Sequence, residues 1–149
     1  MSLESTLSED QKQKLATFVS EVDSAKILNQ VQKMTFGSST LVRFLAGAGF
    51  DTAKAMSQFK EFLSWREKYH IDKVTEVELP ELPQIKKFLP NGFHQTDKSG
   101  RPVWIVQLGS LKLQELLEVV KLDRLEMYFL SEIELCLREK FDDCKEKFG

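Results

Sequence analysis

Residues 51–69 read DTAKAMSQFKEFLSWREKY and carry the clearest helical pattern in the chain. Asp51 suits the N-cap because its carboxylate can accept a hydrogen bond from a free backbone N–H of the first turn. Apolar residues then recur at helical spacing and form one stripe, with Trp65 on its flank. We therefore expect a helical unit whose core contains Phe44, Phe59, Phe62, Leu63 and Trp65.

Upstream of this helix the same periodicity continues. Ser8 followed by Gln11 is typical of a capping box that opens a helix, and apolar residues then recur at helical spacing over residues 15–22. A second apolar stripe runs over residues 27–34, and a third, short helix ends near Gly47. The pattern predicts an all-helical unit over residues 1–79.

Downstream, the helical pattern breaks after residue 70 and resumes as a short helix that stops at Pro90. Residues 93–96 and 102–108 favour β-structure and are separated by a loop that ends in Gly100, so a hairpin near residues 93–108 is predicted. A short helix over residues 113–119 and a long one over 122–141 follow. The fold class is therefore mostly α with one hairpin.

The second strand of this hairpin is apolar on both faces. Val103 and Ile105 lie on one face, and Trp104, Val106 and Leu108 lie on the other. Strands of this kind are usually central and covered on both sides. Since the chain offers no later strand pattern to pair with it, we expect a homodimer through the exposed strand.

Composition excludes several classes of function. The chain has 149 residues, of which 42% are apolar and 30% charged, and its net charge is −2, as expected of a globular protein. No basic segment suggests nucleic-acid binding. No apolar run approaches the roughly 20 residues of a membrane-spanning helix, and the first residues do not resemble a signal peptide, so a cytoplasmic location is expected.

The sequence also predicts no enzyme chemistry. His70 and His94 are isolated, which argues against a metal site, and no nucleophile–base pair can be assembled. Cys136 and Cys144 are best read as reduced thiols, because eight residues of helix would hold them about 12 Å apart. We expect no catalytic residue, no metal and no cofactor.

Two segments resemble a known family. STLVRFL at residues 39–45, Phe50-Asp51-x-x-Lys54-Ala55 and Trp65-Arg66 resemble the helical N-terminal module of the CRAL-TRIO lipid-transfer family. FLPNGFHQTDKSGRPVW at residues 88–104 resembles the opening of its lipid-binding domain, most closely in the yeast-type phosphatidylinositol/phosphatidylcholine transfer proteins. The resemblance implies a helical module over residues 1–79 and the truncated start of an α/β lipid-binding domain over residues 80–149.

The same resemblance implies a function. Members of the family extract a phospholipid, shield its acyl chains from water and exchange it between membranes, with no covalent chemistry; each buried methylene contributes about 0.8 kcal/mol. Phe93 and Trp104 align with aromatic positions that contact the bound phospholipid. Ordinary packing of a hairpin and a buried strand is the interpretation that we favour for them here, because the rest of the pocket wall has no counterpart in the sequence. The implied partners are a phospholipid and, transiently, a membrane surface. The alternative is a protein-interaction or self-association module without lipid transfer.

The sequence departs from the family at residues 46–49, AGAG, where relatives carry basic residues, some of which hold the inositol phosphate. No side chain here can form a charge-assisted hydrogen bond, so weak selectivity for phosphoinositides is expected. The glycines also suggest a close helix approach that would exclude long side chains. The second departure is that the later strands and the helical gate of the lipid-binding domain have no counterpart before residue 149.

Overall fold

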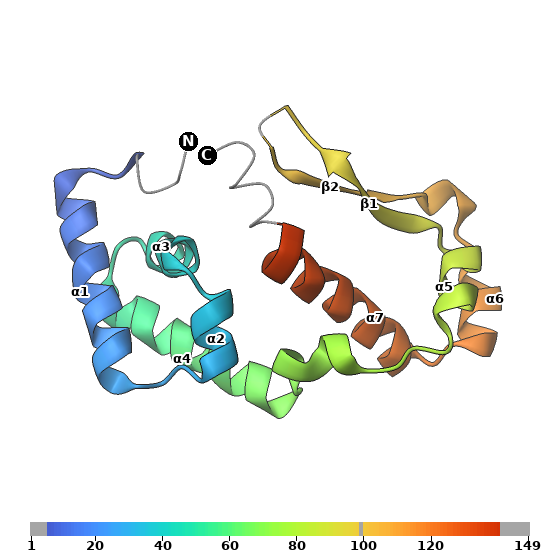
Figure 1. The fold of residues 1–149 in the computed structure, drawn as a ribbon, viewed down its shortest axis with the longest axis horizontal. Coiled ribbons are helices and arrows are strands. Elements are labelled where there is room, and N and C mark those ends of the chain that lie inside the picture. Colours follow the sequence, from blue (N-terminus) through green and yellow to red (C-terminus); the bar gives the residue numbers. More distant parts are fainter. Residues whose placement is uncertain (1–5, 99, 141–149) are drawn as a thin grey trace. The chain divides into compact units, whose positions relative to one another are not determined.

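The computed structural model describes residues 6–98 and 100–140, and the chain divides into two compact units, Met1–Asp72 and Lys73–Gly149. Four helices build the first unit (Figure 1): α1 Glu9–Ala25, α2 Gln30–Thr35, α3 Ser38–Gly47 and α4 Thr52–Lys68. A 3-10 turn, Ile71–Glu76, leads from the first unit into the second. The expected mostly helical fold with one hairpin is confirmed.

The helix starts follow from local hydrogen bonds. The Ser8 hydroxyl accepts from the backbone N–H of Gln11, whose side chain accepts in return from the N–H of Ser8, so the predicted capping box is present. Asp51 caps α4 by accepting from the N–H of Lys54 at 2.9 Å. A second capping box, between Asn29 and Gln32 at the start of α2, was not predicted.

The core of the first unit is centred on Phe59, which is fully buried. Its ring lies 5.0 Å from that of Phe44 and 6.1 Å from that of Phe18, both at steep angles typical of edge-to-face aromatic pairs. Phe62 packs against this cluster. Trp65, in contrast, is 39% exposed, so its assignment to the core was wrong: it stacks on Phe62 with one side and meets solvent with the other.

In the described part of the second unit, the hairpin is followed and preceded by α-helices and short helical turns. The elements of this unit are α5 Leu82–Phe88, β1 Asn91–Thr96, β2 Pro102–Val106, a 3-10 turn Leu108–Ser110, α6 Leu113–Val119, α7 Leu122–Leu135 and a π-helical turn Cys136–Lys140. The long final helix predicted for residues 122–141 thus changes to π-helical geometry at Cys136, and residue 141 lies outside the described part of the chain. Cys136 is buried, whereas Cys144 lies outside the described residues.

β1 and β2 pair antiparallel, with Asn91 opposite Val106 and Phe93 opposite Trp104. The strands differ from the prediction at their ends, because β1 begins two residues earlier and β2 stops at Val106, before Leu108 enters the 3-10 turn. The expected cover on both faces of β2 is not found among the described residues. Ile105 is 46% exposed, and β1 is the one strand that pairs with β2 there.

The other face of the hairpin meets the core of the second unit, where Val106 packs against buried residues of α5, α6 and α7. These buried residues are Ile85, Phe88, Leu89, Leu116, Val120, Leu125 and Tyr128. Glu81, just before α5, and Arg124, in the first turn of α7, form an ion pair at 2.9 Å that links the two helices. One face of the hairpin therefore packs on the core of the second unit, whereas Ile105 on the other face is exposed.

Candidate functional site

The hairpin brings together the two residues that the sequence singled out. Because Phe93 and Trp104 are directly opposite in the register, their side chains leave the sheet on the same face. Their rings stack with centroids 5.5 Å apart and planes inclined by 19°. Both side chains are half-buried. The structure thus places the predicted pair in direct contact, at the edge of the second unit's core.

α7 adds two aromatic residues that sequence reasoning missed. The ring of Phe129 lies 5.8 Å from that of Trp104, and the ring of Tyr128 lies 5.2 Å from that of Phe129. We call Phe93, Trp104, Phe129 and Tyr128 the aromatic row. The amphipathic pattern of α7 could have revealed which face it buries, but the pairing with the hairpin depends on tertiary contact.

Trp104 contributes a polar atom to this row. Its indole Nε1 is buried, and no atom of the described residues accepts a hydrogen bond from it. A buried donor without an acceptor costs roughly 1–3 kcal/mol, so buried indole nitrogens are usually paired. The arrangement is suited to an oxygen acceptor placed beside an apolar surface, since the donor lies among aromatic rings.

A polar network fixes α7 against the hairpin next to the aromatic row. The Lys86 ammonium donates to the Tyr128 hydroxyl oxygen at 2.6 Å, to the Asn91 carbonyl at 3.0 Å and to Asn91 Oδ1 at 3.2 Å. The Tyr128 hydroxyl donates in turn to Asn91 Oδ1, and Asn91 Nδ2 donates to the Leu89 carbonyl at 2.7 Å. Burial raises the pKa of Tyr128, so its hydroxyl stays protonated and can donate.

The network has a consequence for headgroup binding. An ammonium group carries three N–H donors, and those of Lys86 have three acceptors within the chain. The hydrogen bonds of Lys86 are therefore already used to join α5, β1 and α7, and none is left over for a lipid phosphate. We therefore assign Lys86 a structural role.

Residues 46–49 do not show the close helix approach that their glycines suggested. A Cβ atom added to Gly47 or Gly49 would meet nothing within 4 Å, so that interpretation was wrong. Two other features distinguish the segment. Ala48 is buried in the core of the first unit, and Gly49 has φ +69°, a left-handed conformation that side chains other than glycine adopt only with strain.

Arg43 and Arg66 of the first unit differ in environment. Arg66 is 2% exposed and forms an ion pair with Asp72 at 2.7 Å, which is a structural role. Arg43 is exposed and donates to the Thr40 hydroxyl at 3.3 Å. Arg43 is thus the more accessible of the two.

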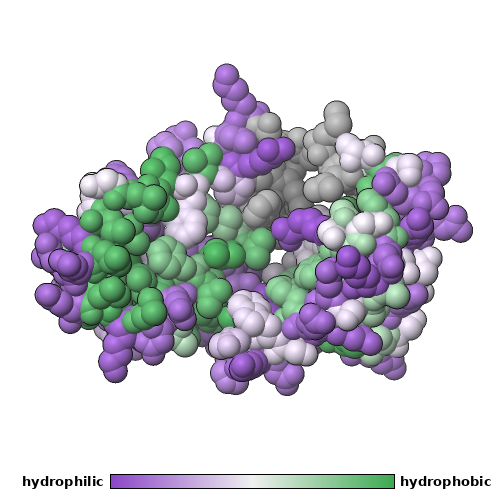
Figure 2. All heavy atoms as spheres, turned by 180° about the vertical axis from the view of Figure 1, so that it is seen from behind, coloured by the Kyte–Doolittle hydropathy of each residue, from purple (hydrophilic) through white to green (hydrophobic). Residues whose placement is uncertain are grey.

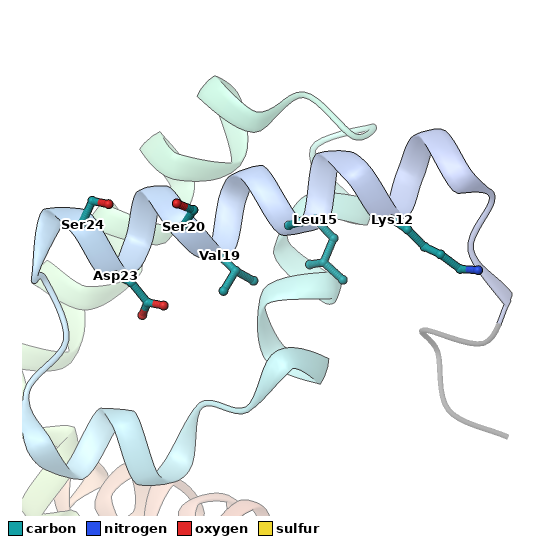
Figure 3. Close-up of a pocket in the computed structure, with 7 residues that line it drawn as sticks. Lys12, Leu15, Val19, Ser20, Asp23 and Ser24 are labelled. Carbon is teal, nitrogen blue, oxygen red and sulfur yellow. The ribbon is translucent and has the colours of Figure 1, made fainter.

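The structure offers little support for other kinds of site. Among the described residues, no group of three or more His, Cys, Asp or Glu side chains could hold a metal ion. A shallow depression of about 510 Å³ in the first unit is lined by seven residues, all from α1 (Figure 3). One helix surface with mixed polar and apolar side chains does not enclose a ligand. Within residues 6–98 and 100–140, none of the helices has the length and apolarity needed to cross a membrane.

Comparisons with known proteins agree with the resemblance stated above. No protein-family model matches the chain. The chain is 37% identical over 105 residues to the phosphatidylinositol/phosphatidylcholine transfer protein SFH7 of Arabidopsis thaliana, and 36% identical over 106 residues to SFH13 of the same plant. It is 30% identical over 118 residues to the SEC14 cytosolic factor of Kluyveromyces lactis.

These similarities cover much of this chain and little of the relatives. The alignments span 70% of the chain for the two plant proteins and 78% for the yeast protein. They cover 19% of SFH7, 17% of SFH13 and 39% of the yeast factor, so the chain spans well under half the length of these curated relatives. An alignment of 105 residues is longer than either unit, whose boundary lies at Asp72, and therefore includes parts of both.

Proposed function

Because the chain is homologous to Sec14-like phosphatidylinositol/phosphatidylcholine transfer proteins over 70% of its length, we propose that it binds a phospholipid and takes part in lipid exchange between membranes. This homology, which extends over both units, is the observation that carries the proposal. The proposed activity is non-enzymatic, and the proposed location is cytoplasmic with transient contact to membranes.

The aromatic row is the proposed contact surface for the lipid. Phe93 and Trp104 present stacked rings at the edge of the core, where acyl methylenes could be removed from water. The Trp104 indole N–H would then donate to an ester or phosphate oxygen of the same molecule, because such an oxygen lies next to the start of the acyl chains. Both kinds of contact are available at one residue.

Tryptophan fluorescence tests this assignment directly, because Trp65 and Trp104 are the only tryptophans. In the Trp65→Phe variant all indole emission comes from Trp104. Phosphatidylcholine with brominated acyl chains should quench this emission, whereas unlabelled phosphatidylcholine should not. The matched Trp104→Phe variant reports from Trp65 in the first unit and should stay unquenched. Equal quenching of both variants, or of neither, would remove Trp104 from the site.

Extraction of the purified chain followed by mass spectrometry tests the function itself. The proposal predicts a bound phospholipid at close to one per chain. The Phe93→Ala variant should retain less lipid, because it removes one ring of the stacked pair. A chain that carries no phospholipid after purification and takes none up from phosphatidylcholine vesicles would contradict the proposed function.

A second candidate function is self-association through the hairpin. The edge of β2 that does not face β1 has no partner strand among the described residues, and Ile105 is largely exposed. Exposed strand edges recruit other chains. Light scattering over a dilution series separates the candidates: a concentration-dependent dimer that binds no lipid would favour self-association, and a lipid-loaded monomer would favour transfer.

A further inference from the structure

The second unit exposes a group of aliphatic side chains in the segment that follows the hairpin. We call it the α6 surface, and it consists of Leu108, Leu113, Leu117, Val119 and Leu122, whose exposed fractions range from 46% to 69%. In the rear view, hydrophobic side chains gather on the part of the face that belongs to the second unit (Figure 2). Exposed apolar side chains that lie close together mark a place of interaction, and Leu113 and Leu117, one turn apart on α6, are such a pair.

The geometry of α6 explains why these side chains remain exposed. Leu116 and Val120 are buried and attach the helix to the core. At 3.6 residues per turn, Leu113 and Leu117 lie one turn apart on one flank of that buried stripe. Both are about half exposed, so they are not needed to hold the helix in place.

The polar residues of α6 lie away from this flank. With the same helical spacing, Glu115 and the exposed Val119 fall on the opposite flank, and Gln114 and Glu118 fall on the back of the helix. Acidic groups are thus directed away from Leu113 and Leu117. A partner that disfavours carboxylates, such as a surface of phosphate groups, could approach this flank.

Lysines stand at both ends of the helix. Lys112 precedes α6 directly and Lys121 follows within two residues, and both are exposed. Lysine side chains at such positions can lay their stems along an apolar surface and place the ammonium at the level of lipid phosphates. Lys112 also lies 3.4 Å from Glu115, but an exposed ion pair of this kind is weak and does not hold it there.

The composition of the α6 surface favours a bilayer over a protein partner. Its five residues are leucines and a valine. The centres of protein–protein interfaces are instead enriched in aromatic residues, methionine and arginine, and leucine is under-represented among the residues that dominate their affinity. Aliphatic side chains flanked by lysines match the apolar and anionic layers of a lipid surface.

We propose that the α6 surface docks on phospholipid bilayers, with Leu113 and Leu117 inserted between the headgroups and Lys112 and Lys121 beside the phosphates. This inference rests on the proposed function, because a protein that exchanges lipids must meet a bilayer. The chain runs from β2, which carries Trp104, through Leu108 into α6, so docking there brings the hairpin to the membrane.

Co-sedimentation with vesicles tests the proposal on the full chain. The probe is phosphatidylcholine vesicles, pure or with added phosphatidylserine. The double variant Leu113→Gln/Leu117→Gln should lower the partition coefficient about tenfold, because two side chains lose their apolar contact with the bilayer. The control Ile133→Gln removes a similarly exposed apolar side chain, 44% exposed on α7, and should bind as the unmodified chain does. Lys112→Gln/Lys121→Gln should weaken binding on the anionic vesicles more than on the neutral ones.

Three results would overturn the proposal. The unmodified chain could fail to bind either vesicle, or the leucine double variant could bind as well as the unmodified chain with an unchanged melting curve. The third is an unmodified chain that forms dimers which the double variant dissolves, because the surface would then join two copies. Failure of the proposed function gives a different set of results. In that case no phospholipid is extracted and Trp104 is not quenched, whereas vesicle binding that depends on Leu113 and Leu117 persists.

Discussion

The guanidinium of Arg66 lies 2.7 Å from the carboxylate of Asp72, and the arginine side chain is 2% exposed, so the first unit contains a buried ion pair near its end. Asp72 also accepts hydrogen bonds from Asn29 at 2.8 Å and from Gln32 at 2.9 Å. The guanidinium in turn lies over the rings of Phe36 and Phe62. One carboxylate therefore links the start of α2, the end of α4 and the turn that follows it.

Asp72→Ala should lower the free energy of unfolding by about 3 kcal/mol, because it leaves the buried Arg66 charge without its carboxylate. Urea unfolding followed by circular dichroism measures the change. Asp10→Ala is the matched control, since Asp10 pairs with Lys14 at 2.8 Å on the exposed side of α1 and should contribute at most about 0.5 kcal/mol. Equal losses of unfolding free energy for the two substitutions would show that the Arg66–Asp72 pair stabilises the chain no more than an exposed ion pair does.

The same pair predicts a dependence of stability on pH. Burial by itself would raise the pKa of the Asp72 carboxyl, but hydrogen bonds from Asn29, Arg66 and Gln32 together with the Arg66 charge lower it overall. Its stabilising contribution is therefore complete above the unfolded-state value of about 3.9 and is lost as the pH falls through the lower folded-state pKa. Melting temperatures of the unmodified chain and Asp72→Ala should converge in this acidic range. A constant difference down to the acid limit would contradict the lowered pKa.

Phe59→Ala should destabilise the first unit by about 3–5 kcal/mol, because a fully buried ring is removed from a cluster of aromatic rings. Thermal unfolding detects a loss of this size as a clear drop in melting temperature. The control is Tyr69→Ala on the exposed end of the same helical pattern, where we expect a change within about 0.5 kcal/mol. An unchanged melting curve for Phe59→Ala would mean that Phe59 does not belong to the core of the first unit.

Tyr128→Phe should destabilise the second unit by roughly 1–3 kcal/mol, because Lys86 loses an acceptor and Asn91 loses a donor in a buried network. Unfolding of the second unit can be followed by Trp104 fluorescence in the Trp65→Phe background, since Trp104 contacts Phe129 next to Tyr128. Tyr69→Phe removes an exposed hydroxyl and should leave stability unchanged. If Tyr128→Phe left the stability unchanged, a water molecule would have to replace the missing hydroxyl in the network.

Basic side chains introduced at positions 46–49 should affect folding differently at different positions of this segment. The unmodified chain should show weak selectivity for phosphoinositides over phosphatidylcholine in a liposome pull-down. Ala48→Arg/Gly49→Lys should be destabilised, because it forces a charge into the core and a side chain into a left-handed conformation. Ala46→Arg/Gly47→Lys should fold normally, because both positions are exposed and Gly47 has open space around it. Strong phosphoinositide selectivity of the unmodified chain would show that other residues hold the headgroup, with Arg43 the accessible candidate.

Features that depend on near neighbours in the chain could be predicted from the order of the residues. Ser8 with Gln11, and Asp51 with Lys54, form their hydrogen bonds over three residues, so the residue types at that spacing predict the helix starts. The hairpin follows from two β-favouring runs with a Gly-containing loop between them, and the similarity to Sec14-like transfer proteins follows from motifs in order along the chain.

Tertiary structure alone decided which residues meet across long separations. Trp65 lies on the flank of the apolar stripe that contains Phe59, and the helices that pack on α4 cover Phe59 and leave Trp65 partly in solvent. Phe129 joins Phe93 and Trp104, and Lys86 reaches Tyr128 from 42 positions away, because α5, the hairpin and α7 share one core. Periodicity shows which face of a helix is apolar, but the partner that covers this face, and how far the cover extends, is set by the packing of the whole unit.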